Sequence, residues 1–131
     1  MLPTSFDQLV VGYEFPSTSY HLTESVIAKY LEAVGGQRHL LTSGIVPPLA
    51  IAAYAMTALS QSFPVPKGAI HAAQEFEFLK LVPIGTTVSC SGRVVQKVQR
   101  GQLHLLALEI NALNQDKEKV LSGKATIAIP A

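Results

Sequence analysis

Side chains that could carry chemistry are few in this sequence, and they gather in two stretches. The first stretch is a polar loop that holds Arg38 and His39, and the second is the start of a predicted strand that holds His71, Gln74 and Glu75. An imidazole and a carboxylate can act together as general acid and general base on one water molecule. The candidate catalytic residues are therefore His71, His39 and Glu75.

The predicted strand that opens with His71 has an alternating pattern. Because successive side chains of a strand point to opposite faces, His71 is expected to share a face with Glu75 and Glu77, opposite Gln74 and Phe76. Two interpretations of His71 stay open. It could be a structural residue at a dimer interface, or it could belong to a line of polar residues at the mouth of a binding site.

His39 lies in a polar loop, where a histidine is usually just solvated. The functional alternative is a displaced acid/base, or a contact to a phosphate group for which Arg38 supplies the charge. The histidines have no spacing typical of metal ligands, so no metal site is predicted. They are His21, His39, His71 and His104.

The composition indicates one ordered globular domain over residues 1–131, because 48% of the residues are hydrophobic and 15% are charged. Ten Lys and Arg stand against nine Asp and Glu, with no basic stripe, so nucleic acid is not expected as a partner. The small charged fraction favours a surface that is covered by another subunit, most simply a second copy.

The single cysteine, Cys90, excludes an internal disulfide and is expected to be a small buried strand residue in a reducing compartment. Residues 1–7 lack the pattern of a signal peptide. The longest apolar run, near residues 45–59, is shorter than the roughly 20 residues that a bilayer requires. We therefore expect a cytoplasmic protein with no membrane partner.

The first half of the chain predicts two helices. Residues 13–22 look extended, and Thr23 is a plausible N-cap of a helix that Gly35 and Gly36 stop. After a loop over residues 36–46, a second helix is predicted over residues 47–61. This helix is apolar on every side, so it is expected to be surrounded by protein.

The second half predicts four strands, over residues 69–79, 87–99, 103–113 and 120–129. A hairpin turn at residues 100–102 and a second turn at residues 114–117 join the last three. Leu106, Leu108, Ile110 and Ala112 share one face of the third strand by alternation. Long antiparallel strands after one buried helix indicate an α+β fold, in which a curved antiparallel sheet wraps around a long central helix.

Together these segments resemble a hotdog domain of the MaoC-like hydratase/dehydratase family. The resemblance is greatest to the N-terminal-half domain of fatty-acid-synthase-type dehydratases, and it covers nearly the whole chain. It rests on the order and spacing of several segments. These are Val11-Gly12, the helix Ile27 to Gly35, Val46-Pro47-Pro48, and His71-x-x-Gln74-x-Phe76 leading to Pro83-Ile84-Gly85.

The sequence departs from the family where the catalytic residues are expected. Active members carry Gly-Asp-x-Asn-Pro-x-His after the first helix, and the Asp and His hold the water that adds to the double bond. Here Gly36 stands in place of the Asp and Leu41 in place of the His, with His39 two positions too early. N-terminal-half domains commonly lack the pair as well, and they shape an acyl tunnel beside a catalytic partner domain.

The resemblance implies three alternative functions. The chain could be an (R)-specific enoyl hydratase/3-hydroxyacyl dehydratase, a lyase, or a subunit of one. It could be an acyl-CoA or acyl-carrier-protein binding module without activity, which the missing pair favours. It could also be a hotdog thioesterase, which the absence of an acid from the central helix disfavours.

All three alternatives imply an acyl-thioester ligand, no redox or metal cofactor, and a homodimer or a heterodimer with a catalytic hotdog subunit. The thioester carbonyl would point at N–H groups at the start of the central helix, where Leu49 and Ala50 follow two prolines. Arg38 and Gln74 complete the expected substrate contacts.

Overall fold

The computed structural model describes residues 8–62 and 66–130, except for the side chain of Arg38. The N-terminal residues that lack a signal-peptide pattern therefore lie outside the described residues. So does the side chain of Arg38, which was expected to contact a phosphate group.

The elements follow one another in the order that the sequence predicts, with one short helix added. The structure contains β1 (Thr18–His21), α1 (Glu24–Ala33), the 3-10 helix η2 (Arg38–Ser43), α2 (Pro48–Ser62), β2 (Ile70–Phe78), β3 (Thr87–Arg100), β4 (Leu103–Leu113) and β5 (Lys119–Pro130). The loop expected over residues 36–46 thus contains a 3-10 helix. The extended segment 13–22 forms a strand only at its end, with a separate bridge between Glu14 and Arg93.

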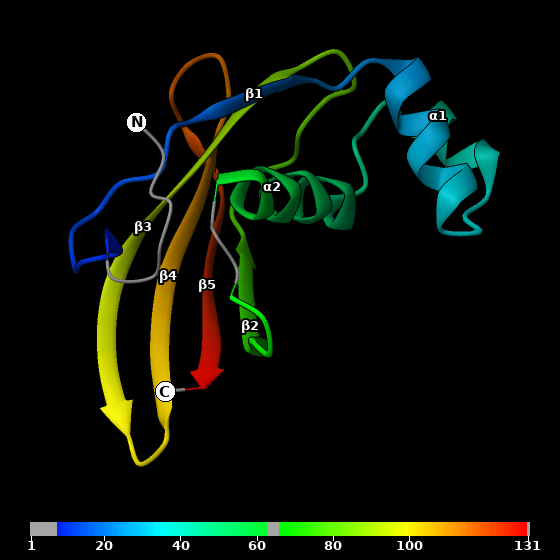
Figure 1. Ribbon diagram of the computed structural model, residues 1–131. Helices are drawn as coiled ribbons and strands as arrows, with labels where there is room; N and C mark the ends of the chain where they lie inside the picture. The colour runs from blue at the N-terminus through cyan, green and yellow to red at the C-terminus, as the bar shows by residue number, and fades with distance from the viewer. Residues whose placement is uncertain (1–7, 63–65, 131) are drawn as a thin grey trace.

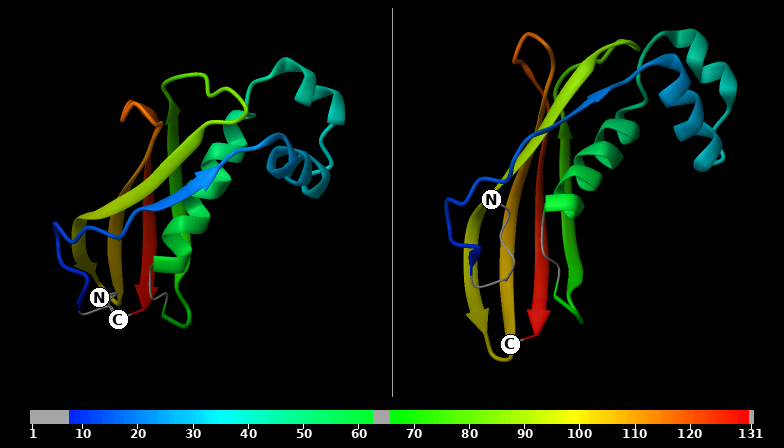
Figure 2. Two further views of the ribbon diagram at one scale, coloured as in Figure 1. Left: turned by 90° about the horizontal axis from the view of Figure 1, so that it is seen from above. Right: turned by 45° about the horizontal axis from the view of Figure 1, so that its top comes forward.

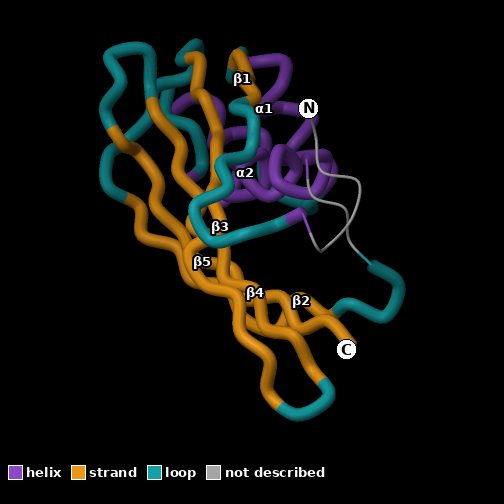
Figure 3. Tube along the Cα trace, turned by 60° about the vertical axis from the view of Figure 1, so that its left-hand side comes forward, coloured by secondary structure: helices purple, strands orange, loops and turns teal. Residues whose placement is uncertain are grey.

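The strands form one antiparallel sheet in the order β1-β3-β4-β5-β2. The sheet curves around α2, as Figures 1 and 2 show. All helices lie on one side of the sheet (Figure 3), which defines an inner face toward α2 and an outer face away from it. The α+β architecture with a central helix is therefore confirmed.

The core lies between α2 and the inner face. The predicted face of β4 is confirmed, because Leu106, Leu108, Ile110 and Ala112 are all at most 1% exposed. Cys90 on β3 is also fully buried, as expected of a small strand residue.

The first helix begins and ends where the sequence predicts. The Thr23 side chain accepts a hydrogen bond from the Val26 N–H at 3.2 Å, and Glu24 lies in the first turn. Gly35 follows the C-cap with φ of 73°, a left-handed conformation that favours glycine.

The expectation that α2 is surrounded by protein is wrong for the single chain. One stripe of the helix is exposed, and Leu49 at its start is 64% exposed. The stripe consists of Leu49, Ala53, Thr57 and Ser60. The sheet covers the opposite side of the helix, because α2 packs mainly against β3 and β4.

Two β-bulges lie at the same level of the sheet. Val95 is the extra residue in β3, opposite Leu108 and Ala107 of β4. Ala72 is the extra residue in β2, opposite Ile127 and Thr126 of β5. Bulges bend the bulged strand and increase its twist, so they contribute to the curvature of the sheet around α2. We call the part of the sheet beyond them, toward the β3–β4 turn, the distal half.

Candidate functional site

The bulge at Ala72 changes where His71 points. His71 pairs with Ile127 and Gln74 pairs with Ala125, which lie on the same face of β5. The His71 Nε2 and Gln74 Oε1 atoms are 2.8 Å apart, within hydrogen-bond distance. The prediction that these two residues lie on opposite faces is wrong, because simple alternation does not count the extra residue.

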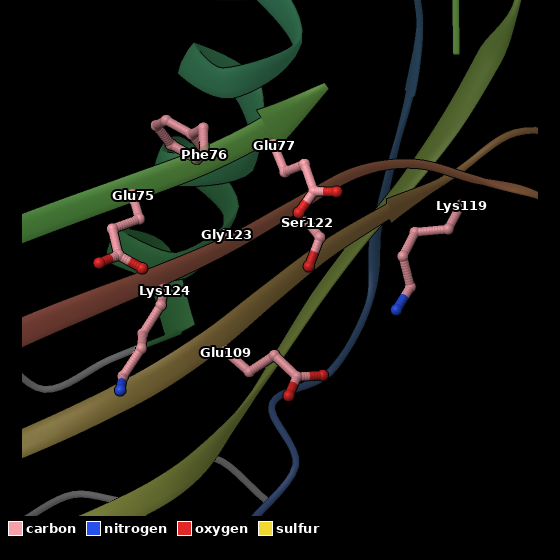
Figure 4. Close-up of a pocket in the computed structure, with 8 residues that line it drawn as sticks. All are labelled: Glu75, Phe76, Glu77, Glu109, Lys119, Ser122, Gly123 and Lys124. Atoms are coloured by element: carbon pink, nitrogen blue, oxygen red, sulfur yellow. The ribbon is translucent and has the colours of Figure 1, made fainter. Parts of the chain in front are cut away.

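Glu75 lies on the outer face, away from His71. It pairs with Lys124, and Figure 4 shows both side chains on the side of the sheet away from α2, whereas Phe76 points toward the helix. The predicted grouping of His71 with Glu75 and Glu77 is therefore wrong, and the structure does not bring a carboxylate of β2 beside the imidazole.

His39 lies on η2 and is exposed. Its carbonyl oxygen accepts a hydrogen bond from the Thr42 hydroxyl at 2.6 Å, which helps to close the short helix. Leu41, which occupies the family's histidine position, is half-buried and packs against the core.

No carboxylate occurs anywhere between Glu32 and Glu75 in the sequence. This stretch includes the loop after α1, η2 and the whole of α2. The elements that would face an acyl thioester at the start of α2 therefore supply no acid or general base of the Asp/Glu type.

The start of α2 offers one backbone donor fewer than expected. The Ala50 N–H donates to the Pro47 carbonyl oxygen at 2.9 Å, and Pro48 has no N–H. The Leu49 N–H belongs to the same turn, and the Leu49 side chain is exposed. Any polarisation of a carbonyl at this helix end would depend on few donors.

Exposed apolar side chains gather near this helix end. The Val46 N–H donates to the Val82 carbonyl oxygen at 2.7 Å, which ties the start of α2 to the segment that follows β2. Four large apolar side chains in these segments are at least 42% exposed: Leu49, Phe78, Leu79 and Leu81. We call this set the α2-start patch.

A small apolar pocket lies between α2 and β3. Its lining combines small residues of the helix and the strand with one aromatic ring, and it consists of Phe15, Pro16, Ala55, Ala58, Leu59, Cys90, Ser91 and Gly92. Sequence reasoning missed this pocket because Phe15 is far from α2 in the chain. The available signal was Gly92, since a glycine inside a strand often marks a close approach.

Buried polar groups border the same region. The Tyr20 and Tyr54 rings are 4.8 Å apart, and the Tyr20 hydroxyl is buried without a hydrogen-bond partner among the described residues. Burial raises the pKa of Tyr20, with a smaller contribution from Cys90. Burial also raises the pKa of the Cys90 thiol to about 11. Both groups are therefore neutral at physiological pH, which suits an apolar surrounding.

The described residues contain no group of three or more His, Cys, Asp or Glu side chains placed to hold a metal ion. Among the helices over the same residues, none is long and apolar enough to cross a membrane.

Comparison with known proteins finds solved structures of similar fold. No family model matches the sequence, and no curated protein matches it either. The (R)-hydratase from A. caviae involved in PHA biosynthesis aligns with a TM-score of 0.79 and 19% identity, covering 94% of this chain and 98% of that one.

Two further solved structures are similar over most of their length. The MaoC-like dehydratase from Rhodospirillum rubrum has a TM-score of 0.77 and 22% identity, over 95% of both chains. The HadBC (3R-hydroxyacyl-ACP dehydratase) complex from Mycobacterium tuberculosis has a TM-score of 0.73 and 16% identity, over 91% of this chain and 96% of that one. The chain therefore has the hotdog fold, as the resemblance to MaoC-like proteins implies.

Proposed function

We propose that the chain is an acyl-thioester-binding subunit of a MaoC-like hydratase/dehydratase, which assists a catalytic hotdog chain and does not catalyse the reaction alone. The observation that carries the proposal is the absence of any Asp or Glu between Glu32 and Glu75. Adding water to an enoyl thioester requires a group that activates the water and one that returns a proton. The proposed reaction needs no redox or metal cofactor.

The apolar pocket between α2 and β3 supports the acyl-binding part. Its lining of Phe15, Ala58 and Leu59 suits a hydrocarbon chain, because ligand pockets are lined mainly by apolar side chains. The neutral Cys90 thiol beside it adds no charge. The ligand that we propose for this pocket is the acyl chain of a 2-enoyl or 3-hydroxyacyl thioester of CoA or acyl carrier protein. The lining side chains would have to move apart to admit it, because the free space in the pocket is about 10 Å³.

The exposed edge of β2 supports the partner part. β2 is the last strand of the sheet, so one side of its backbone has no neighbouring strand. The α2-start patch lies next to the end of this strand. The HadBC structure is a complex of two different hotdog chains, which is the kind of assembly that we propose here.

The purified chain alone tests the proposal. With a short trans-2-enoyl-CoA, we expect no loss of the enoyl absorbance, while calorimetry detects binding of the acyl-CoA. Replacing Ala58 with Phe should weaken binding about tenfold or more, since Ala58 is buried and lines the pocket, and the added ring would take the space proposed for the acyl chain. Ala53→Phe, on the exposed side of the same helix, is the matched control and should bind normally.

One observation favours a second function, a hydratase that is active by itself. The hydrogen-bond contact with Gln74 at 2.8 Å orients the His71 ring on the inner face, where the imidazole could act as a base. Turnover by the wild-type chain that is lost in His71→Ala, with the fold retained, would support this function and contradict the proposed one.

A further inference from the structure

The outer face of the sheet changes character along its length. Near the β4–β5 turn it is polar, as is usual for an antiparallel sheet with one solvated face. In the distal half apolar side chains are more frequent, although Gln96, Arg100 and Thr126 share this face and the helices all lie on the other side (Figure 3).

In the distal half, the central strand β4 carries apolar side chains on both faces. Leu106 and Leu108 of β4 face α2, whereas Leu105 and Ala107 between them face outward. Continuous apolar runs are typical of strands that are covered on both sides. The sequence of β4 therefore indicates that the outer face of the distal half is covered by protein.

One row of apolar side chains crosses the outer face of the distal half from β3 to β2. Val98 pairs with Leu105, Leu105 with Ala128, and Ala128 with Ile70, so four apolar side chains cross the sheet in line. Ile70 at the end of this apolar row is 62% exposed. Val98 and Leu105 are half-buried and Ala128 is 7% exposed, so Ile70 presents most of the exposed apolar surface of this row. Exposed apolar surface often marks an interaction site.

A charged row runs parallel to the apolar row. Arg93 pairs with Glu109, Glu109 with Lys124, and Lys124 with Glu75, so the charges alternate in sign across four strands. The Arg93 and Glu109 side chains form an ion pair at 3.3 Å. Figure 4 shows Lys124 between Glu75 and Glu109, all on the outer face.

Both rows are self-complementary under the same symmetry. A two-fold axis parallel to the strands, between β4 and β5, would place the outer face of a second copy on this one with β3 over β2 and β4 over β5. Arg93 would then face Glu75 of the second copy, and Glu109 would face its Lys124. In the apolar row, Leu105 would face the small Ala128.

We propose that this outer face, comprising the apolar row and the charged row, docks a second copy of the chain about such a two-fold axis. The complementarity of charge and of size favours a second copy over an unrelated partner, because an isologous contact places each residue against its symmetry mate. Packed sheets of this kind keep their strand directions within about 30°. The face is separate from the β2 edge and the pocket, so the inference does not rest on the proposed function.

Charge reversal tests the contact. Glu75→Lys and Arg93→Glu should each create two like-charge contacts per pair of copies and raise the dissociation constant of the face contact about tenfold or more. The double variant should return to within about threefold of the wild-type value, because the new glutamate at position 93 would then face the new lysine at position 75 of the second copy. The measurement is sedimentation velocity over a range of concentrations, with circular dichroism as the check on folding.

The double variant separates this contact from effects within one chain. Within one chain, the double variant keeps both new like-charge pairs: the glutamate at position 93 beside Glu109, and the lysine at position 75 beside Lys124. Recovered self-association therefore cannot come from reduced charge repulsion within the sheet of one chain. The two substituted positions are also three strands apart, roughly 14 Å, so a contact through the β2 edge cannot couple them. Glu32→Lys on exposed α1 is the matched control for net charge.

Recovery of self-association in the double variant would establish the contact. A double variant that associates no better than the single ones would overturn the proposal. So would a wild-type chain that stays monomeric, or one whose association neither single variant weakens.

Discussion

Two glycines on the inner face set how closely side chains approach the sheet. Gly92 and Gly123 both pair with Ile110, and Gly123 also pairs with Phe76. A Cβ atom at Gly123 would lie 2.8 Å from the Phe76 ring and 2.9 Å from the Glu75 carbonyl oxygen. The ring therefore lies directly over the glycine, where a side chain at this position would hold it away.

Gly123→Ala should lower the free energy of unfolding by about 1–3 kcal/mol, because the backbone carbonyl cannot move aside as a side chain could. Urea unfolding measures the change. Ser122→Ala, one residue earlier on the outer face, should change stability by less than about 0.5 kcal/mol. Equal effects of the two substitutions would contradict the role of the ring contact.

The buried Cys90 thiol predicts a pH dependence of stability. Its pKa is raised from 9.0 to about 11 by burial, so between these values the unfolded chain binds fewer protons than the folded one. The free energy of unfolding should therefore fall as pH rises from about 9 to 11, by roughly 2–3 kcal/mol from this group. Cys90→Ala should remove that part of the decline, and identical pH profiles for the two proteins would refute the prediction.

At the scale of elements, local signals predicted more than long-range ones. Thr23, Glu24 and Gly35 act within one helix, so its limits follow from the sequence. The bulge at Ala72 was not predictable in this way, because a bulge depends on how β2 meets β5 and has no fixed sequence pattern. That single residue is the reason why His71 was assigned to the wrong face.

The candidate site shows the same division. The lack of an acid between Glu32 and Glu75 is visible in the sequence, and it still carries the proposed function. The pocket is not visible in the sequence. Its lining residues Phe15, Leu59 and Gly92 come together only when β3 pairs within the sheet and α2 packs against it. The exposed stripe on α2 was also missed, since an apolar helix indicates burial without saying whether the same chain supplies the cover.

The N-cap of α1 gives a prediction for this element. Thr23→Ala should lower the free energy of unfolding by about 1 kcal/mol, because the Val26 N–H would lose its acceptor. Thr23→Ser keeps the hydroxyl and should stay within about 0.5 kcal/mol of the wild type in urea unfolding. A large loss in the serine variant would show that the methyl group, and not the cap, matters.

At the scale of the whole molecule, the surfaces that the described residues leave uncovered include the β2 edge, the α2-start patch, the exposed stripe of α2 and part of the apolar row. The Leu79 N–H donates to Val120 of β5 at 2.9 Å. Since this direction alternates along an antiparallel strand, the Glu75 N–H points to β5 and the Gln74 N–H points to the exposed edge.

Gln74→Pro should therefore block pairing of another strand with the β2 edge while it preserves the hydrogen bonds to β5. We expect loss of association with a catalytic hotdog chain in co-purification. Gln74→Ala removes the side-chain contact to His71 but keeps the N–H, so it should still associate. If both variants lose the partner, the amide side chain and not the strand edge makes the contact.

The two bulges determine where the chain can lose a single residue without a change of strand register. A one-codon deletion inside a strand normally turns every later side chain to the wrong side of the sheet. Losing the codon for Val95 or for Ala72 would not, because Gln96 already faces Ala107 and Ala73 already faces Thr126. Shortened versions of the chain could arise at these two codons with every other residue in place, and their sheets would be flatter.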